Sequence, residues 1–518
     1  MKTLTVAAGS FLLASASFGQ GSWTNVPNWP TADDEAHAIH MNHLRPANPA
    51  MGNKGRFLFW EKMEGPSQSP YIWNPYSGGG TFTLTATGGE LDYMIFCCGQ
   101  TLMKNGKVIA CGSGFENHVT TTRVSVFDPL TDTWSTQAGH WMNQKRYYPS
   151  VIRMPYGEIV VAGGQAEDSG NIWIYDNPYE VQTDVLNANN AWVSPSPNDY
   201  YFINYPQLYA HSASEVFFAG SARRSALYGG TAYQTFLFTT SSQTFVPYGG
   251  ESRVWWRACS AMIRPGLIFK CGGFTESDDG DPYSGQGGWP SDPPASVRSE
   301  IFNLASDVPW TQKTNMNHAR LDFNLVLLPD GTAMAVGGST KHSDVNTIVR
   351  TPEIYDLTTN TWTDVANHST AFRGYHSSAA LMPDGRVVLA GADLNATPSA
   401  EIYTPTYCTN GTRPNIVTAP DVIQVGVSDG FPITVNDAAV NGACLIALGS
   451  MTHGWDSNQR YIPLTVNGTG TSKSLSGVTS VTQTPLGWYM LFVTKPAAGG
   501  GVTLGNLAKY VYVDIGGE

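Results

Sequence analysis

The sequence predicts an all-β protein built from a repeated unit. Charged residues make up only 14% of the chain and glycine is abundant, with 54 residues, which favours turn-rich sheets over helices. A recurring segment encloses small and β-branched residues between two glycines that lie six positions apart. Clear copies of this segment end at Gly112, Gly164, Gly273, Gly338 and Gly391, and weaker copies end at Trp60 and Gly220.

The period of the repeat predicts the architecture. Successive copies lie roughly 50 to 65 residues apart, and a four-stranded kelch propeller blade takes about 50 residues. In each copy an apolar strand, buried on both faces, leads to glycines where the backbone turns close to its neighbour. Asn-Gly or Asp-Gly pairs at Gly106, Gly331 and Gly385 predict hairpin turns before the strands. We therefore expect a seven-bladed kelch β-propeller over residues 21–412, because unrelated β-sandwiches would lack a fixed period.

Different segments flank the repeats. In residues 1–20, Lys2 precedes an apolar run and then small residues, which is the pattern of a signal peptide and predicts secretion. After the linker "NGTRPNI", residues 413–518 alternate apolar and polar positions, as in "PITVND" and "YVYVDI". This alternation predicts a small C-terminal immunoglobulin-like β-sandwich. No later segment approaches the 18 or more apolar residues of a membrane span, so we expect no membrane partner.

Charge and cysteine content narrow the function. The formal net charge is −12 and no cluster of Lys and Arg is present, which argues against a nucleic-acid partner. The chain has seven cysteines, two of which are adjacent in the motif "FCCG" at Cys97 and Cys98. An odd number in an exported protein indicates that one cysteine is free or specially used. The other six are candidates for packing or pairing.

A propeller is a scaffold, so function must come from particular side chains. The residues that stand out in predicted loops are Cys97, Tyr148, Tyr375, His376 and His453. Taken singly, a loop histidine is more often hydrogen-bonded than metal-binding, and Tyr148 is more often a packing residue. Tyr375 and His376 are neighbours, and neighbours in a strand point to opposite faces. Both can serve one site only if they lie on an irregular turn before the strand "SSAALM".

Two histidines, two tyrosines and a cysteine are an unusual set. Imidazole suits copper, and a phenolate oxygen suits its cupric state. Zinc would more often use several cysteines, or a histidine with acidic partners at short spacing. An alternative metal cluster is formed by His37, His40 and His43. These three lie on a β-like stretch, where the alternation of a strand would divide them between two faces.

Four motifs in order resemble the copper radical oxidases, the family of galactose oxidase and glyoxal oxidase, over essentially the whole mature chain. The motifs are "FCCG", "RYYPS", "GYHSSAALMPDGRV" and "THGWDSNQRYIPL". The resemblance implies one copper ion and a thioether bond between Cys97 and the ring of Tyr148. It implies that His376 and His453 are imidazole ligands, Tyr148 an equatorial phenolate, and Tyr375 an axial phenolate and general base. His453 must then reach the propeller axis from the second domain.

The resemblance also implies an activity. A secreted monomer would oxidise primary alcohols or small aldehydes with O2, and would release aldehydes or acids and H2O2. The oxidation removes two electrons while cupric copper accepts one, so a radical on the cross-linked Tyr148 would be the second acceptor. The competing hypothesis is a non-catalytic kelch propeller that binds a glycan or a protein, with the same residues purely structural.

The sequence departs from galactose oxidase at two positions. Ala166 stands where galactose oxidase has the tryptophan that stacks over the cross-linked tyrosine. Pro206 follows Tyr205 where galactose oxidase has an arginine that grips the sugar, so galactose is not expected to be the best substrate. The motifs "RYYPS", "INYP" and "DNPYEV" are closer to the glyoxal oxidase branch. Alternative shields for the radical are Trp141, Tyr147, Trp173 and Trp255.

Overall fold

The structure is a computed structural model of the 518-residue chain. It describes residues 20–30, 37–49, 54–61, 70–77, 80–85, 91, 93–112, 121–136, 141–142, 145–164, 184–186, 192–193, 201–202, 205–219, 222–223, 234–242, 244–254, 257–274, 294–342, 344–391 and 398–516. In this part of the chain the regular structure is almost entirely strand, with two short 3-10 helices at Val345–Thr347 and Thr406–Cys408.

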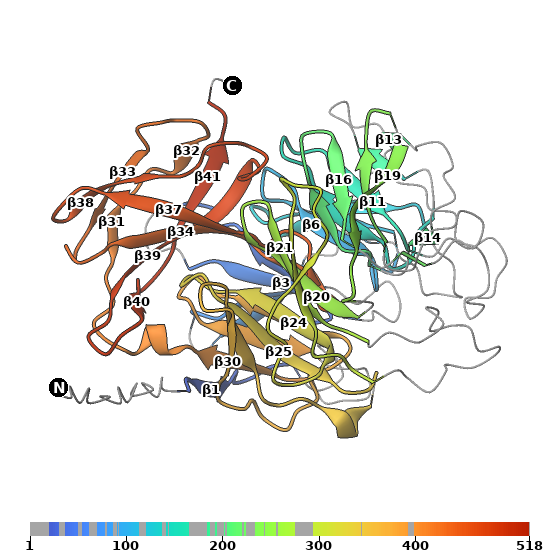
Figure 1. Ribbon diagram of the computed structural model, residues 1–518, viewed down its shortest axis with the longest axis horizontal. Coiled ribbons are helices and arrows are strands. Elements are labelled where there is room, and N and C mark those ends of the chain that lie inside the picture. The colour runs from blue at the N-terminus through green and yellow to red at the C-terminus, as the bar shows by residue number, and fades with distance from the viewer. Residues whose placement is uncertain are drawn as a thin grey trace, which may run out of the picture.

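Antiparallel sheets form a β-propeller, as the repeat predicted (Figure 1). The first sheets in chain order are β2 (His40–Leu44), β3 (Arg56–Trp60), β4 (Tyr71–Asn74) and β5 (Thr81–Leu84); then β6 (Gly99–Leu102), β7 (Val108–Cys111), β8 (Val124–Asp128) and β9 (Thr133–Thr136); then β10 (Ser150–Arg153), β11 (Ile159–Ala162), β12 (Asp184–Leu186) and β13 (Trp192–Val193). The next sheets are β15 (Leu208–Ala210), β16 (Glu215–Phe218), β18 (Gln234–Thr239) and β19 (Thr244–Glu251); then β20 (Ala258–Arg264), β21 (Leu267–Gly272), β22 (Ser299–Asn303) and β23 (Thr311–Gln312); then β24 (Leu321–Leu327), β25 (Ala333–Ser339), β26 (Glu353–Asp356) and β27 (Thr361–Asp364). The last sheet joins β28 (Ser377–Leu381), β29 (Val387–Gly391) and β30 (Ala400–Thr404) with the N-terminal β1 (Ser22–Asn25). A separate pair is formed by β14 (Tyr201–Phe202) and β17 (Ala222–Arg223).

The first strand of each sheet lies on the inside of the propeller. Strand β6 contacts β10, β10 contacts β15, β20 contacts β24, β24 contacts β28, and β28 contacts β2. The N-terminal strand β1 pairs with β30, so the two ends of the propeller meet in one sheet. The loops just before the inner strands are therefore brought together at the axis.

Glycine permits close approach of the backbone beside two of these loops. A Cβ added at Gly164 would lie 2.6 Å from the carbonyl oxygen of Tyr147, and one at Gly391 would lie 2.7 Å from that of His376. Both glycines have a positive φ, +83° and +77°, which other residues rarely adopt. The glycines of the repeat thus allow the loops that carry Tyr147 and His376 to pack against the inner strands.

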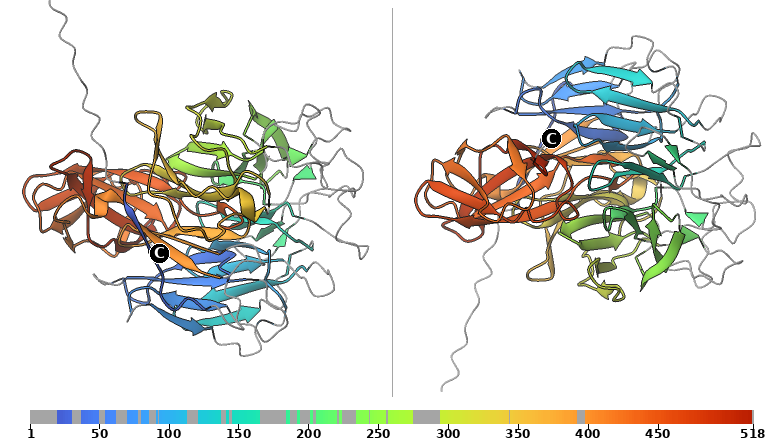
Figure 2. Two further views of the ribbon diagram at one scale, coloured as in Figure 1. Left: turned by 90° about the horizontal axis from the view of Figure 1, so that it is seen from below. Right: turned by 90° about the horizontal axis from the view of Figure 1, so that it is seen from above.

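The C-terminal unit is a β-sandwich-like domain, coloured orange to red in Figures 1 and 2. Its strands are β31 (Ile416–Thr418), β32 (Val422–Gln424), β33 (Phe431–Val435), β34 (Gly442–Ala447), β37 (Tyr461–Asn467), β38 (Ser472–Ser476), β39 (Gly487–Pro496), β40 (Val502–Leu504) and β41 (Lys509–Asp514). Cys444 and Tyr461 of this unit belong to one apolar cluster with Phe323 of the propeller. The two units therefore share a core.

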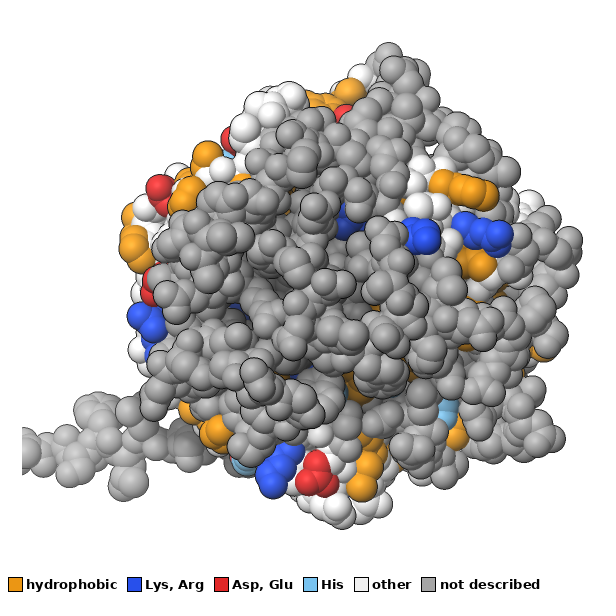
Figure 3. All heavy atoms as spheres, turned by 90° about the vertical axis from the view of Figure 1, so that its right-hand side faces the viewer, with side chains coloured by type: hydrophobic (Ala, Val, Ile, Leu, Met, Phe, Trp, Pro, Cys, Tyr) orange, Lys and Arg blue, Asp and Glu red, His pale blue; other side chains and the backbone are white. Residues whose placement is uncertain are grey.

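The surface and the lengths of the helices can be set against what a membrane-spanning protein requires. Figure 3 shows the side of the molecule that lies to the right in Figure 1, where described apolar, basic and acidic side chains are interspersed. Among the described residues, no helix is long and apolar enough to cross a membrane.

Candidate metal centre

Residues with left-handed backbone are concentrated where the chain enters the inner strands. A positive φ is rare outside glycine, and such residues cluster at functional sites because they cost free energy that packing must offset. Residues with a positive φ lie just before five of the inner strands, and one lies inside β24 where the pairing with β25 skips a residue. They are Cys97 (φ 54°), Tyr148 (60°), Tyr205 (49°), Arg257 (59°), Asp322 (54°) and His376 (69°).

His453 reaches the same place from the C-terminal unit. It lies in the turn between β35 (Ser450–Thr452) and β36 (Trp455–Asp456), and it also has a positive φ of 51°. Strand β35 pairs with the inner strand β2 and contacts β6 and β28, while β36 contacts β20 and β24. The hairpin therefore lies among the inner strands at the axis. The expectation that His453 comes from the second domain agrees with this placement.

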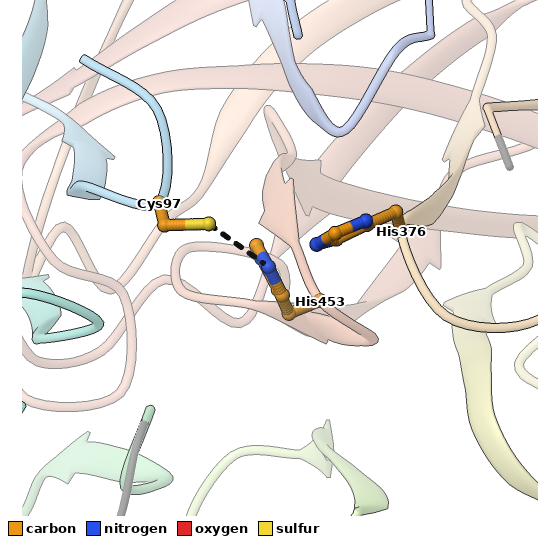
Figure 4. A group of neighbouring side chains, drawn as sticks. All are labelled: Cys97, His376 and His453. Carbon is orange, nitrogen blue, oxygen red and sulfur yellow. Dashed lines mark hydrogen bonds between the residues drawn. The ribbon is translucent and has the colours of Figure 1, made fainter. Parts of the chain in front are cut away.

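Three of the residues offer metal-binding atoms at short range (Figure 4). The ligand atoms of Cys97, His376 and His453 all lie within 4.8 Å of one another. Cys97 Sγ is 3.5 Å from His453 Nε2, and His453 lies between the other two residues in Figure 4.

Both predicted tyrosines join this group. The hydroxyl oxygens of Tyr148 and Tyr375 are 3.2 Å apart. The ring centroids of Tyr148 and Tyr375 lie 5.3 and 5.4 Å from that of His453. Tyr375 and His376 occupy a turn directly before β28, with ring centroids 3.9 Å apart, so the irregular turn expected there is present. All five sequence-predicted site residues thus converge.

Hydrogen bonds select the histidine atom that faces the centre. The Thr452 hydroxyl donates to the Ile39 carbonyl oxygen at 3.1 Å, so it accepts a hydrogen bond from His453 Nδ1 at 2.6 Å. The lone pair of Nε2 is then directed to the site. Burial, reinforced by neighbouring histidines, lowers the pKa of both His376 and His453 well below the ordinary value. Both imidazoles are therefore neutral, which is the form that binds metals.

The donor set fits a copper ion. Two neutral imidazoles and two phenol oxygens match the ligand preference of cupric copper. Burial first, and the neighbouring Cys97 second, raise the pKa of Tyr148 and of Tyr375 well above the ordinary value. A buried phenolate at either position requires a nearby cation, and a metal ion would provide it.

One side of the centre is an apolar wall, made of Ile39, Phe96, Cys97 and Tyr147. Tyr148 packs against this wall, and its backbone N–H donates to the Cys97 carbonyl oxygen at 3.0 Å. The Tyr147 ring lies at 4.1 Å from the Tyr148 ring between centroids, and its hydroxyl donates to the Tyr148 hydroxyl at 3.3 Å. Tyr147 is thus the aromatic residue of the apolar wall that covers Tyr148.

Among the other candidates to cover the Tyr148 ring, only Trp141 lies in the described part of the structure. Trp141 is 45% exposed and lies beside the guanidinium of Arg123. Trp173, Trp255 and Ala166 fall outside the described residues. Tyr205, which precedes Pro206, stacks on His453 with centroids 4.6 Å apart.

His40 is a site residue that sequence reasoning missed. Its Nε2 accepts a hydrogen bond from the Cys97 backbone N–H at 3.0 Å, so its Nδ1 donates to Gln100 Oε1 at 3.1 Å. Gln100 in turn donates to the carbonyl oxygen of Met451 in the His453 hairpin at 2.9 Å. His43 of the same strand bonds Tyr510 instead. The expected separation of these histidines is present, and His40 supports Cys97 and the hairpin.

An ionic wall, made of Arg257, Asp322 and His342, was also missed. Arg257 Nη1 donates to Asp322 Oδ1 at 2.8 Å, and His342 Nδ1 lies 2.7 Å from Asp322 Oδ2. The Arg257 guanidinium lies over the Tyr375 ring at 5.1 Å, and the His342 ring lies 4.7 Å from it. No sequence motif indicates these three residues, because they are far apart in the sequence.

The adjacent cysteines have different surroundings. Cys97 belongs to the apolar wall, whereas Cys98 belongs to the large apolar core. The segment is a turn, in which Cys97 has a positive φ. The two thiols still lie in separate clusters.

Comparison with known proteins identifies the family. The family model described as "Glyoxal oxidase N-terminus" matches residues 90–410, and "Galactose oxidase-like, Early set domain" matches residues 413–502. A galactose oxidase of Gibberella zeae is 27% identical over 485 residues, which cover 86% of this chain and 66% of that protein. The chain therefore spans just under two thirds of that relative. Aldehyde oxidase GLOX1 of Arabidopsis thaliana is 23% identical over 458 residues, or 77% of this chain and 69% of that protein.

A solved structure shares the fold. It is described as a novel fungal alcohol oxidase with catalytic diversity among the AA5 family, in complex with copper. The two folds agree with a TM-score of 0.73 at 21% identity, over 96% of this chain and 100% of that one. Because the glyoxal oxidase model alone matches more than half of the residues, the chain belongs to the copper radical oxidase family of glyoxal oxidase and galactose oxidase.

Proposed function

We propose that the protein is a secreted oxidase that converts primary alcohols or small aldehydes with O2 and releases H2O2. The observation that carries this proposal is the convergence of Cys97, Tyr148, Tyr375, His376 and His453 at the propeller axis. The similarity to proteins named galactose oxidase and aldehyde oxidase supports it.

The nitrogen atoms of His376 and His453 and the oxygen atoms of Tyr148 and Tyr375 would hold one copper ion. When bound, copper supplies a one-electron acceptor. The oxidation of an alcohol removes two electrons, so the protein itself must supply the other acceptor. The apolar wall beside Tyr148 provides a place for it.

We infer that the second acceptor is a radical on Tyr148, whose ring is joined to Cys97 by a thioether. A C–S bond forms between Cys97 Sγ and a ring carbon of Tyr148, while the S–H and one ring C–H bond break. The two electrons and two protons released reduce one O2 to H2O2. The cross-linked ring would be easier to oxidise, and the apolar wall covers one side of it.

Each of the two tyrosines would then have its own role in the oxidation of the substrate. Tyr375 would take the hydroxyl proton, the Tyr148 radical would take a hydrogen atom from the carbon that bears the hydroxyl, and the remaining electron would go to bound copper. O2 would then take up both electrons and two protons as H2O2, which restores the radical. The overall reaction is RCH2OH + O2 → RCHO + H2O2, and a hydrated aldehyde gives an acid in the same way. The hydroxyl oxygens of Tyr148 and Tyr375 lie 3.2 Å apart, so both can reach one substrate carbon and its oxygen.

The finer features of the proposal concern substrate and architecture. Pro206 has no donor for a sugar hydroxyl, which supports small substrates, as in the glyoxal oxidase branch, over galactose. We also propose that the propeller has seven blades, with residues 21–412 as the propeller and 413–518 as the sandwich. Contacts join β6 to β10 and β15, and β20 through β24 and β28 to β2. Strand β35 contacts both β2 and β6, and the hydroxyls of Tyr209 in β15 and Ser260 in β20 lie 2.5 Å apart, which supports a closed ring.

Peroxide release with a panel of alcohols and aldehydes tests the proposal. Protein loaded with cupric copper in air is expected to lose the mass of two hydrogens and then to release H2O2. His453→Ala should bind no stoichiometric copper, whereas His318→Ala, on an exposed part of the propeller, should bind one ion. A wild-type protein that binds copper but forms neither cross-link nor peroxide would support the non-catalytic propeller instead.

A further inference from the structure

The ionic wall occupies the positions from which the propeller builds its centre. Arg257 and Asp322 have the same left-handed backbone as Cys97, Tyr148 and His376, each in its own sheet. A positive φ costs Arg257 conformational free energy, since arginine rarely adopts it, whereas aspartate tolerates it better. This conformational cost is expected where a side chain has to point toward the axis for a functional reason.

Stability alone does not explain the ion pair. The side chains of Arg257 and Asp322 are only 9% and 5% exposed, and desolvating two charges typically offsets what their attraction contributes. Burial would raise the pKa of Asp322, but the charges of Arg257 and His342 outweigh burial and lower it to about 2. The carboxylate is therefore ionised, and its two oxygens fix Arg257 on one side and His342 on the other.

The ionic wall also borders the accessible part of the centre. Cys97 and His376 are buried, whereas Tyr148, Tyr375 and His453 are partly accessible to solvent, and the side chains of Arg257 and His342 keep 9% and 13% exposure. Arg257 and His342 both lie against the ring of Tyr375. A substrate whose hydroxyl approaches Tyr375 from this side meets the guanidinium.

We propose that Arg257 is a specificity-determining residue that donates a hydrogen bond to a second oxygen of the substrate, and that Asp322 and His342 position it. A guanidinium presents its N–H donors in a planar fork, and Asp322 Oδ1 accepts from Nη1 and so fixes the orientation of the fork. Because Asp322 balances the charge of Arg257, the favoured second group is a neutral hydroxyl or carbonyl and not an anion. This inference rests on the proposed oxidase function.

A matched pair of substrates tests the assignment. 1-Propanol and 1,2-propanediol each have one primary alcohol and differ by one hydroxyl. The readout is the ratio of kcat/KM for the diol to that for the monoalcohol. Arg257→Met, which keeps length but removes every donor, should lower this ratio roughly 10- to 100-fold, as expected for one hydrogen bond from a charged donor. Arg257→Lys, which keeps a charge but not the fork of donors, should give an intermediate ratio.

The controls separate the possible failures. Copper content and the loss of two hydrogens are measured on each variant first, so a wild-type protein without peroxide release would refute the oxidase proposal and not the role of Arg257. If activity on both substrates falls by the same factor in Arg257→Met, the residue is only structural and the inference is wrong. If Arg257→Met does not fold, an unchanged ratio in Arg257→Lys overturns the inference by itself.

Discussion

The apolar wall and the ionic wall border the same pair of tyrosines but are built from opposite materials. The apolar wall, around Cys97, packs against Tyr148 and contains only apolar or phenolic side chains. The ionic wall packs against Tyr375 through a guanidinium and an imidazole, both held by one carboxylate. The two phenol oxygens nevertheless lie 3.2 Å apart.

The difference teaches how one small site can serve two needs. The proposed radical on Tyr148 needs surroundings that limit contact with water, and the buried thiol and rings of the apolar wall cover one side of that ring. A polar substrate needs fixed hydrogen-bond donors, which are effective because their orientation is already set before the substrate binds. Each wall can be changed separately, so the comparison is open to experiment.

The largest expected effect is on the apolar wall. Cys97→Ser removes the sulfur of the cross-link, so the loss of two hydrogens on copper loading should disappear and kcat should fall by more than about a hundredfold, or about 2.7 kcal/mol. Intact mass and peroxide release measure both effects. Cys98→Ala is the matched control, because Cys98 belongs to the large core and should leave the cross-link intact. A serine variant as active as the wild type would refute the assignment.

A smaller effect is expected from the support behind this wall. His40→Phe keeps a ring against Trp60 but removes the acceptor of the Cys97 N–H. Loss of such a supporting bond typically costs 10- to 100-fold, and we expect the rate of cross-link formation to fall by about that factor. Time-resolved mass spectrometry after copper addition measures the rate. His43→Phe, on the same strand but bonded to Tyr510, should mature at the wild-type rate; equal slowing in both variants would exclude a specific role for His40.

The ionic wall should respond to pH where the apolar wall does not. The pKa of Asp322 is lowered to about 2 from its ordinary value of 3.8. Its ionisation therefore stabilises the folded state fully at pH values above 3.8, and this stabilisation is lost as the pH falls through 2. The contribution is about 2 kcal/mol. The difference in unfolding free energy between wild type and Asp322→Asn should therefore shrink from pH 5 to pH 2.5. Urea titrations at both values measure it, and a constant difference would contradict the assignment.

The smallest effect concerns the hydroxyl of Tyr147. Tyr147→Phe keeps the ring against Tyr148 but removes the hydrogen bond to its hydroxyl. A neutral hydrogen bond is worth about 0.5 to 1.5 kcal/mol, so kcat should change by roughly two- to tenfold. Tyr156→Phe, at an exposed position, is the control. A loss as large as that of Cys97→Ser would mean that the Tyr147 hydroxyl takes part in the chemistry itself.

Much of the fold and of the site was predictable because the signals are local. The glycine-bounded segments predicted inner strands such as Val387–Gly391, and the motifs around Cys97, Tyr148, Tyr375, His376 and His453 selected residues that do converge. His40 was not predictable as a support for Cys97, since the two residues meet only when strand β2 lies beside the β6 loop. Its sequence neighbours His37 and His43 suggested a metal cluster instead.

The sequence by itself determined the repeat, the family and the identities of five site residues, because each is written in a short stretch of chain with a fixed spacing. Only the tertiary structure decided which other side chains surround them. Asp322 and His342 meet because β24 pairs with β25, and Arg257 meets Asp322 because the sheet of β20 packs beside that of β24 around one axis. The left-handed backbone of Arg257 is held by packing against neighbouring strands, a long-range effect that no local preference of arginine encodes.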